Sequence, residues 1–283
     1  MRLAGGIMVA RGIKQHVRLW SQFRLIILIA ALWCTALPTG TAQAQSDFWP
    51  NMSFRTGVEY TEGDYGAETD TSILLIPFIG QVQMESVRVR VSVPWIRIKG
   101  PGSVVGGTDG RLVIGPAIGP VTTRSGLGDV VASISYMLPS ASGLWPLVEV
   151  TGKVKFPTAS DTKGLGTGNF DYTVQANMLQ SLGRFTPFVT VGYRFRSDST
   201  GLALNNGVLV SAGIDYSVRD TITAGLIFDY REASTAVTSS VQEFMPNVTW
   251  RPTDNVSINA YGVIGASDGS PNGGGGIQLR VAL

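Results

Sequence analysis

The sequence lacks any apolar run long enough to cross a bilayer as a helix. Its longest one, Leu25–Leu37, has about thirteen residues, whereas a spanning helix needs about 20. Beyond Leu37 the apolar residues almost nowhere recur at the i, i+3, i+4 spacing of an amphipathic helix. The sequence therefore argues against a protein that crosses a membrane with helices, and against a helical soluble domain.

Histidine and cysteine each occur once, as His16 and Cys34, and both lie in the first 44 residues. The rest of the chain therefore lacks the usual general base and the usual ligands of zinc. The segment Gly265-Ala-Ser267-Asp-Gly269 matches the nucleophile-elbow pattern, but no histidine is there to activate the serine. We predict no enzyme and no cofactor, although a calcium site made by loop carboxylates stays open.

The first 44 residues have the layout of a secretory signal peptide. Five basic residues precede the apolar run, and Ala42-Gln43-Ala44 follows it as a small-x-small cleavage motif. We predict that residues 1–44 are cleaved and that residues 45–283 form the mature protein. Of the 22 basic residues, 17 then remain against 20 acidic ones. The basic pI of the whole chain is thus no sign of nucleic-acid binding.

After residue 44 the dominant pattern is alternation of apolar with polar or small residues, which is typical of strands. In Val208–Val218 the valines, Ala212, Ile214 and Tyr216 share one face. Twelve such segments lie near 52–61, 72–80, 86–98, 128–138, 146–156, 169–179, 185–196, 207–218, 221–231, 241–251, 256–265 and 275–283. The run 72–80 is apolar on both faces. An even number of antiparallel strands is expected of a bacterial outer-membrane barrel.

The links between these segments alternate in length. Short links fall at 81–85, 139–145, 180–184, 219–220 and 252–255, and longer ones fall at 62–71, 99–127, 157–168, 197–206, 232–240 and 266–274. Outer-membrane barrels have short periplasmic turns and longer external loops. We therefore predict an all-β fold, an antiparallel transmembrane β-barrel of about twelve strands with both termini periplasmic.

Aromatic residues on the outward face gather near both ends of the predicted strands. Near the long links they are Tyr60, Trp95, Phe156, Phe170, Tyr172, Tyr193, Phe195, Phe228, Tyr230 and Phe244, and near the short links Phe54, Tyr136, Phe185, Tyr216 and Trp250. Two such girdles are typical of barrels that span a membrane. A soluble β-sandwich also alternates, but it would not place aromatics at both ends of so many strands.

The inward face carries many charges. They are Arg88, Arg90, Glu149, Lys153, Lys155, Asp171, Arg194, Arg196, Asp229, Arg231 and Glu243, together with Arg55, Glu59, Asp215, Arg251 and Arg280. Lys155, Asp171 and Arg196 lie on three successive strands, so cross-strand pairing is expected. Two interpretations stay open: a salt-bridge network that stiffens the wall, or a polar constriction that sets selectivity.

Four inward residues are apolar instead: Leu209, Ile227, Met245 and Val263. They lie on consecutive strands in the half nearer the long links, where a water-filled lumen would be polar. One interpretation is packing under a folded-in loop, for which the long link 99–127 is a candidate. The other is a binding site for an aromatic or aliphatic solute.

Several motifs resemble the outer-membrane family labelled "MetA-pathway of phenol degradation". They are Val91-Ser-Val-Pro-Trp95, Ser125-Gly-Leu-Gly-Asp129, Tyr136-Met-Leu-Pro139, Lys153-Val-Lys-Phe-Pro-Thr158, Leu165-Gly-Thr-Gly-Asn-Phe-Asp-Tyr172 and the segment 177–193. Together they cover most of the chain after about residue 70. The resemblance implies a barrel that transports small aromatic or otherwise apolar compounds.

Three functions follow as hypotheses. The first is an outer-membrane channel for passive passage of small, partly apolar solutes. The second is a structural or surface-interaction barrel with a filled lumen, and the third, with least support, is an enzyme acting on lipid. The expected partners are outer-membrane lipid and lipopolysaccharide, the barrel assembly machinery and a small-molecule solute, with no nucleic acid.

Overall fold

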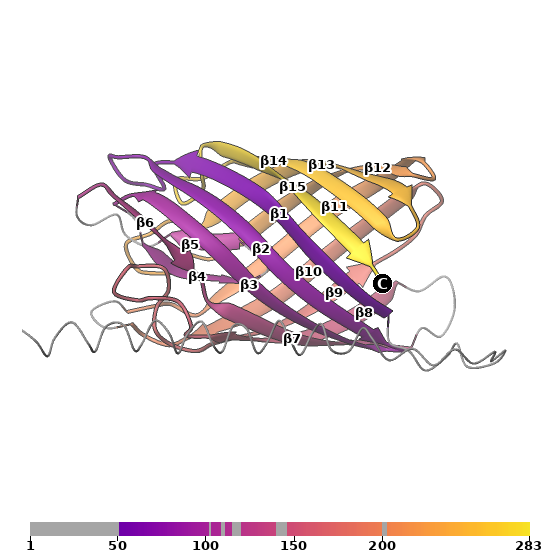
Figure 1. Cartoon of the computed structure of the whole chain (residues 1–283), viewed down its shortest axis with the longest axis horizontal. Coiled ribbons are helices and arrows are strands. Elements are labelled where there is room, and N and C mark those ends of the chain that lie inside the picture. The colour runs from indigo at the N-terminus through magenta and orange to yellow at the C-terminus, as the bar shows by residue number, and fades with distance from the viewer. Residues whose placement is uncertain (1–50, 102, 109–110, 115–119, 140–145, 200–202) are drawn as a thin grey trace, which may run out of the picture. The chain divides into compact units, whose positions relative to one another are not determined.

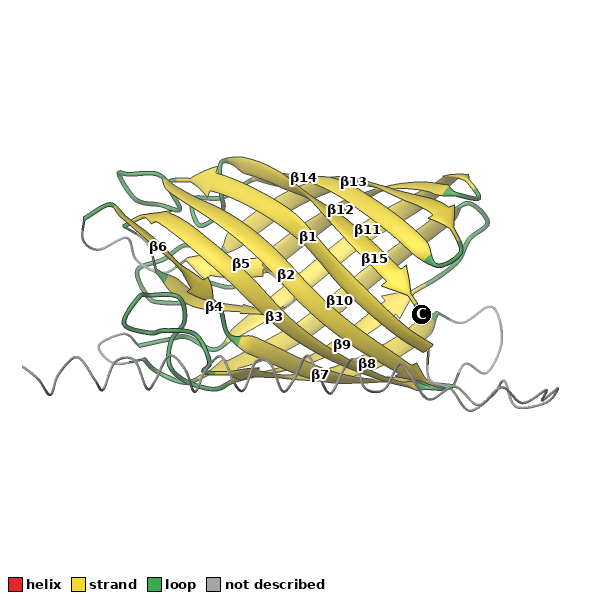
Figure 2. Ribbon diagram, viewed as in Figure 1, coloured by secondary structure: helices red, strands yellow, loops and turns green. Residues whose placement is uncertain are grey.

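The computed structural model describes residues 51–283 apart from 102, 109–110, 115–119, 140–145 and 200–202. The predicted signal peptide, residues 1–44, lies outside the described residues, and its cleavage stays a prediction. All regular elements in the described part are strands (Figure 2). No helix in that part is long and apolar enough to cross a membrane.

The strands are β1 (Asn51–Gly63), β2 (Thr71–Met84), β3 (Val87–Gly100), β4 (Val104–Thr108), β5 (Arg111–Ile114), β6 (Thr122–Leu127), β7 (Val130–Met137), β8 (Leu147–Phe156), β9 (Asp171–Leu179), β10 (Phe185–Arg196), β11 (Gly207–Arg219), β12 (Ile222–Arg231), β13 (Val241–Thr253), β14 (Val256–Gly265) and β15 (Gly273–Ala282).

Antiparallel pairing closes the sheet into a barrel (Figure 1). From β7 to β15 each strand pairs with the next one in the chain, and β15 pairs with β1. The ring continues from β1 to β2, from β2 to β3 and from β3 to β7. Because β6 and β7 lie one after the other along β3, the wall has twelve strand positions, as predicted.

The two ends of the barrel differ in the length of their connections. At one end, here called the short-turn end, β2 and β3 are only two residues apart, as are β11 and β12, and β13 and β14. The opposite end, here called the long-loop end, carries the connections β1–β2, β8–β9, β10–β11, β12–β13 and β14–β15, each of at least seven residues. One connection of nine residues, between β7 and β8, lies at the short-turn end. Ser53 lies opposite Ala282 in the register, so the first strand begins and the last strand ends at the short-turn end.

The predicted link 99–127 is wrong, because it contains β4, β5 and β6. β6 pairs with the long-loop end of β3, and β7 pairs with its other end. Between them Gly128 donates its N–H to the carbonyl of Pro94 over 2.8 Å. A Cβ on Gly128 would lie 2.4 Å from Cδ1 of the buried Ile96 and 2.9 Å from Cγ of Pro94, so a larger residue at this break would displace side chains of β3. The predicted strand 128–138 is thus the second half of an interrupted strand.

The outer surface of the barrel is apolar and aromatic. Phe54, Tyr172, Phe185 and Trp250 each expose more than two fifths of their surface, as their outward positions predicted. Leu226 and Ile134 are also exposed, between the aromatic ends. In water such a surface would be unfavourable, whereas in a bilayer it contacts hydrocarbon.

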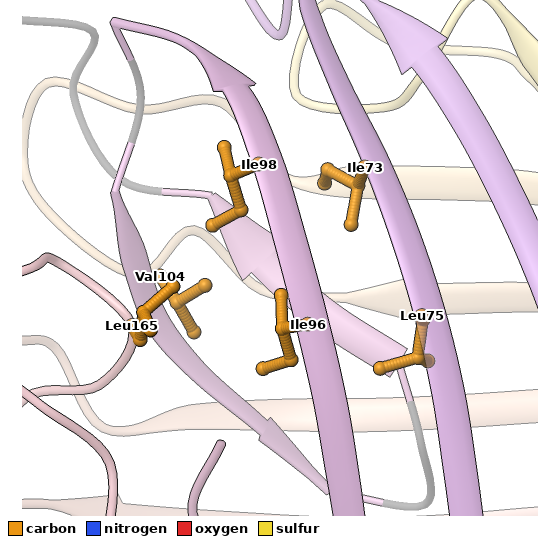
Figure 3. Close-up of a cluster of buried hydrophobic side chains, with 6 residues drawn as sticks. All are labelled: Ile73, Leu75, Ile96, Ile98, Val104 and Leu165. Carbon is orange, nitrogen blue, oxygen red and sulfur yellow. The ribbon is translucent and has the colours of Figure 1, made fainter. Parts of the chain in front are cut away.

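A hydrophobic core lies inside the barrel at the long-loop end. It joins Ile73 and Leu75 of β2, Ile96 and Ile98 of β3, Val104 of β4 and Leu165 of the β8–β9 loop (Figure 3). The outward face of β2 is exposed or half-buried instead. The apolar character of both faces of 72–80 therefore has two causes: one face packs under folded-in loops, and the other lies on the outer surface.

Candidate functional site: the barrel interior

Lys155 is the centre of a buried charge cluster at the long-loop end. Its Nζ lies 2.8 Å from Oδ2 of Asp129 and 3.2 Å from Oδ2 of Asp171. It also donates to Oγ1 of Thr167 over 2.8 Å. The side chain of Lys155 is only 1% exposed. A cation this deeply buried is stable only if it is paired, and here two carboxylates pair with it.

Asp129 holds this cluster to the wall. It follows Gly128 at the break between β6 and β7, where the chain leaves the regular ladder. Besides Lys155, its carboxylate accepts the N–H of Ala159 in the β8–β9 loop over 2.9 Å. The interruption of the strand thus gives the folded-in loop an anchor. Sequence reasoning placed Asp129 in a motif but did not identify it as an interior charge.

A second charge cluster surrounds Arg231 on β12. Its guanidinium lies 2.9 Å from Asp229 and 2.6 Å from Glu243 of β13. Asp229 also accepts a hydrogen bond from Ser211. Asp229, Arg231 and Glu243 are almost fully buried, so the predicted inward charges here form a paired network.

The remaining predicted charges divide between the two ends. Lys153 and Arg194 are buried. Arg196 donates to the carbonyl of Asn205 over 2.7 Å at the long-loop end. At the short-turn end Arg88 forms a salt bridge with Glu149, with 2.8 Å between Nη1 and Oε2.

The β1–β2 loop contributes an aromatic residue to the interior. Tyr65 has a left-handed backbone with φ of 51°, and it is followed by Gly66, whose N–H donates to Asp64 over 2.8 Å. This turn directs the Tyr65 ring onto the hydrophobic core, where its hydroxyl lies 3.2 Å from that of Thr61. Burial raises the pKa of the Tyr65 hydroxyl.

Two cavities of about 290 Å³ each lie near the middle of the barrel. Both are lined by Ile227 and Met245, so they adjoin one another. Leu209 lines one of them, together with Phe188 of β10. Val263 does not join them but lines a much smaller cavity of about 20 Å³ at the long-loop end. Three of the four predicted apolar residues thus line two adjoining cavities.

Sequence reasoning missed several apolar side chains that line these cavities. Phe188 shares its face of β10 with Thr190 and Arg194, so alternation alone could have identified it. Across the barrel Leu75, Pro77 and Ile79 of β2 line the other central cavity. The ambiguous run 72–80 gave no indication of which of its faces would be inward.

A third cavity, of about 380 Å³, opens at the short-turn end. Its lining is polar and basic: Arg55, Gln81, Arg88, Arg90, Thr249, Arg251, Ser257, Asn259, Gln278 and Arg280. Four of these residues, Arg55, Arg90, Asn259 and Gln278, also line the first central cavity. The cavity at this end therefore adjoins the first central cavity. Among the described residues no group of histidine, cysteine or carboxylate side chains has a metal-binding arrangement.

No model of a known protein family matches the sequence, and no curated protein matches it. The resemblance to the phenol-degradation family therefore stays a prediction. Among solved structures, the KdgM porin in complex with disordered oligogalacturonate has a TM-score of 0.48 at 10% identity, over 82% of this chain and 99% of that chain. The outer membrane channel DcaP of Acinetobacter baumannii has a TM-score of 0.40 at 11% identity, over 87% and 100% of the two chains.

A third solved structure is more similar. The COG4313 outer membrane channel from Pseudomonas putida F1 matches with a TM-score of 0.61 at 13% identity, over 88% of this chain and 100% of that chain. At this identity the likeness concerns the fold. The chain therefore has the β-barrel fold of that outer membrane channel.

Proposed function

We propose that the protein is an outer-membrane channel through which small solutes with an apolar or aromatic part pass passively. The observation that carries this proposal is the pair of adjoining cavities around Ile227 and Met245 inside a closed barrel. A lumen filled only with water is lined by polar residues. Here Leu75, Pro77 and Ile79 face one of these cavities from the opposite wall, which favours a solute that is itself partly apolar.

The exposed apolar surface supports a location in the outer membrane. Aromatic side chains at both ends of the strands and aliphatic ones between them match the surface of a bilayer-spanning barrel. We infer contacts with outer-membrane lipid and lipopolysaccharide, insertion by the barrel assembly machinery, and an orientation with the short-turn end in the periplasm. This function requires no catalytic residue.

Liposome swelling with neutral, membrane-impermeant solutes tests the proposal. Phenyl glucoside carries an aromatic ring, and maltose is a polar solute of similar size without one. We expect vesicles with the protein to admit phenyl glucoside faster than maltose. The substitution Ile227→Trp fills the central space and should slow phenyl glucoside several-fold.

Leu226→Trp is the matched control, because Leu226 precedes Ile227 on β12 and is exposed on the outer surface. It should leave swelling unchanged. Equal rates for Ile227→Trp and wild type, or vesicles closed to both solutes, would contradict the proposed channel.

A barrel with a structural or surface-interaction role is the second candidate. The observation that favours it is the filled long-loop end, where the hydrophobic core and the Lys155 cluster occupy the interior. Under this alternative, vesicles stay closed to both solutes, and substitutions of inward charges change stability alone.

A further inference from the structure

The cavity at the short-turn end contains a concentration of arginines. Arg55 of β1, Arg88 and Arg90 of β3, Arg251 of β13 and Arg280 of β15 all line it. The positive charge of Arg55 is repelled by those of Arg88, Arg90 and Arg280. Four strands therefore direct guanidinium groups into one space.

The register of β1 and β15 places two of these arginines opposite each other, which is unfavourable when no anion is bound between them. Arg55 lies directly opposite Arg280 in the β1–β15 pair, and like charges in that position destabilise a sheet. Two neighbouring positions on the same face carry neutral partners instead, since Arg90 donates to Gln81 over 3.1 Å and Arg88 donates to Gln83 over 2.9 Å. The register thus opposes two arginines, whereas the two β2–β3 pairs each oppose an arginine with a glutamine.

Carboxylates offset only part of this charge. Glu149 pairs with Arg88, and Asp215 interacts electrostatically with Arg251. Glu59 lines the adjoining central cavity together with Arg55 and Arg90. Within the described residues, Arg55 and Arg280 form no salt bridge. At the long-loop end, in contrast, Lys155 and Arg231 each contact two carboxylates. The cavity therefore has unbalanced positive charge that an anion from solution would neutralise.

Apolar surface adjoins the arginines. Arg55 and Arg90 also line the central cavity, where Pro77, Ile79 and Val131 are among their neighbours. The two cavities, of about 290 and 380 Å³, lie near the lower end of the range of about 300 to 1,000 Å³ for small-molecule sites. A molecule that spans their junction would meet arginines at one end and a mixture of apolar and polar side chains at the other.

We propose that this junction binds small organic anions, with a carboxylate at Arg55 and Arg280 and an apolar or aromatic body toward Pro77 and Ile79. The inference rests on the proposed channel function and names the class of solute. Guanidinium groups bind carboxylates with charge-assisted, often bidentate hydrogen bonds. The same arginines make the channel selective for anions over cations.

Binding to the full-length barrel in nonionic detergent tests the site without requiring flux. Isothermal titration calorimetry would compare benzoate, benzamide and inorganic phosphate. Benzamide has the shape of benzoate without its charge, and phosphate has charge without an apolar body. We expect benzoate to bind most tightly, and added KCl to weaken its binding.

The double substitution Arg55→Gln/Arg280→Gln should weaken benzoate about tenfold or more, since it removes charged hydrogen-bond donors. In planar bilayers it should also move the reversal potential in a KCl gradient toward equal permeability of the two ions. The control is Arg219→Gln, because Arg219 is an exposed arginine at the end of β11 that lines none of these cavities. If the double variant fails to fold, Arg280→Gln alone serves.

Unchanged benzoate binding in the arginine variant, or benzamide binding as tightly as benzoate, would overturn the site. Phosphate binding as tightly as benzoate would overturn the amphipathic class of ligand. The two proposals fail separately. Benzoate binding without any solute flux would contradict the channel function and support the binding site. Phenyl glucoside flux without benzoate binding would contradict the binding site and support the channel function.

Discussion

The two halves of the barrel interior contain similar charged side chains in different environments. At the long-loop end, cations are buried and paired with carboxylates, and a hydrophobic core packs beside them. At the short-turn end, arginines line a cavity of about 380 Å³ and one pair of them is directly opposed. A buried ion without a partner costs several kcal/mol, so burial requires pairing at one end. Solvent at the other end permits unbalanced charge, and with it the capacity to bind an anion.

The largest difference between the halves should appear when one cation is removed from each. Lys155→Met keeps the length of the side chain but leaves Asp129 and Asp171 buried without their partner. We expect it to lower the free energy of unfolding by about 3–5 kcal/mol. Arg280→Met, which removes one of the opposed arginines, should cost less than about 1 kcal/mol or stabilise the sheet slightly. Urea unfolding in lipid vesicles, followed by tryptophan fluorescence, measures both.

Equal losses of stability in Lys155→Met and Arg280→Met would contradict this division of the interior. The expected difference follows from burial, because the side chain of Lys155 is only 1% exposed, whereas Arg280 faces the open cavity.

A smaller difference should separate the inner core from the outer surface. Ile98→Ala removes a fully buried side chain from the hydrophobic core and should cost about 3 kcal/mol. Ile134→Ala removes a side chain of the same size from the outer surface, where it is 58% exposed. Lipid can fill the space it leaves, so no cavity forms and only the transfer of its carbons from water to hydrocarbon is lost, about 2 kcal/mol. The same unfolding experiment compares them. A greater loss for Ile134→Ala would indicate that the long-loop end is not filled as described.

Alternation in the sequence predicted most of the wall, because a period of two is local and needs no knowledge of partners. It placed Arg88, Glu149 and Lys155 inward, and the structure shows each in an interior ion pair. It could not predict the interruption at Gly128, since a break in the ladder follows from the close approach of Pro94 and Ile96 on another strand.

The difference between the two halves depends on pairing between distant segments. Arg55 and Arg280 meet because the first strand pairs with the last, and this register cannot be read from either segment alone. The folded-in loops raise the same difficulty. Val104 and Leu165 lie in segments without a clear pattern, yet they complete the core above β2 and β3. Sequence reasoning therefore identified the inward residues but not which of them would be covered.

Thiol labelling tests the central claim of one filled and one open half most directly. The only cysteine, Cys34, lies in the predicted signal peptide, so single cysteines can be introduced without background. Ser257→Cys lies in the short-turn cavity, and Thr173→Cys lies in the filled half, where Thr173 is 1% exposed. We predict that an anionic methanethiosulfonate modifies Ser257→Cys quickly, and faster than a cationic one does, while Thr173→Cys reacts very slowly with both. Equal rates at the two positions would contradict the account.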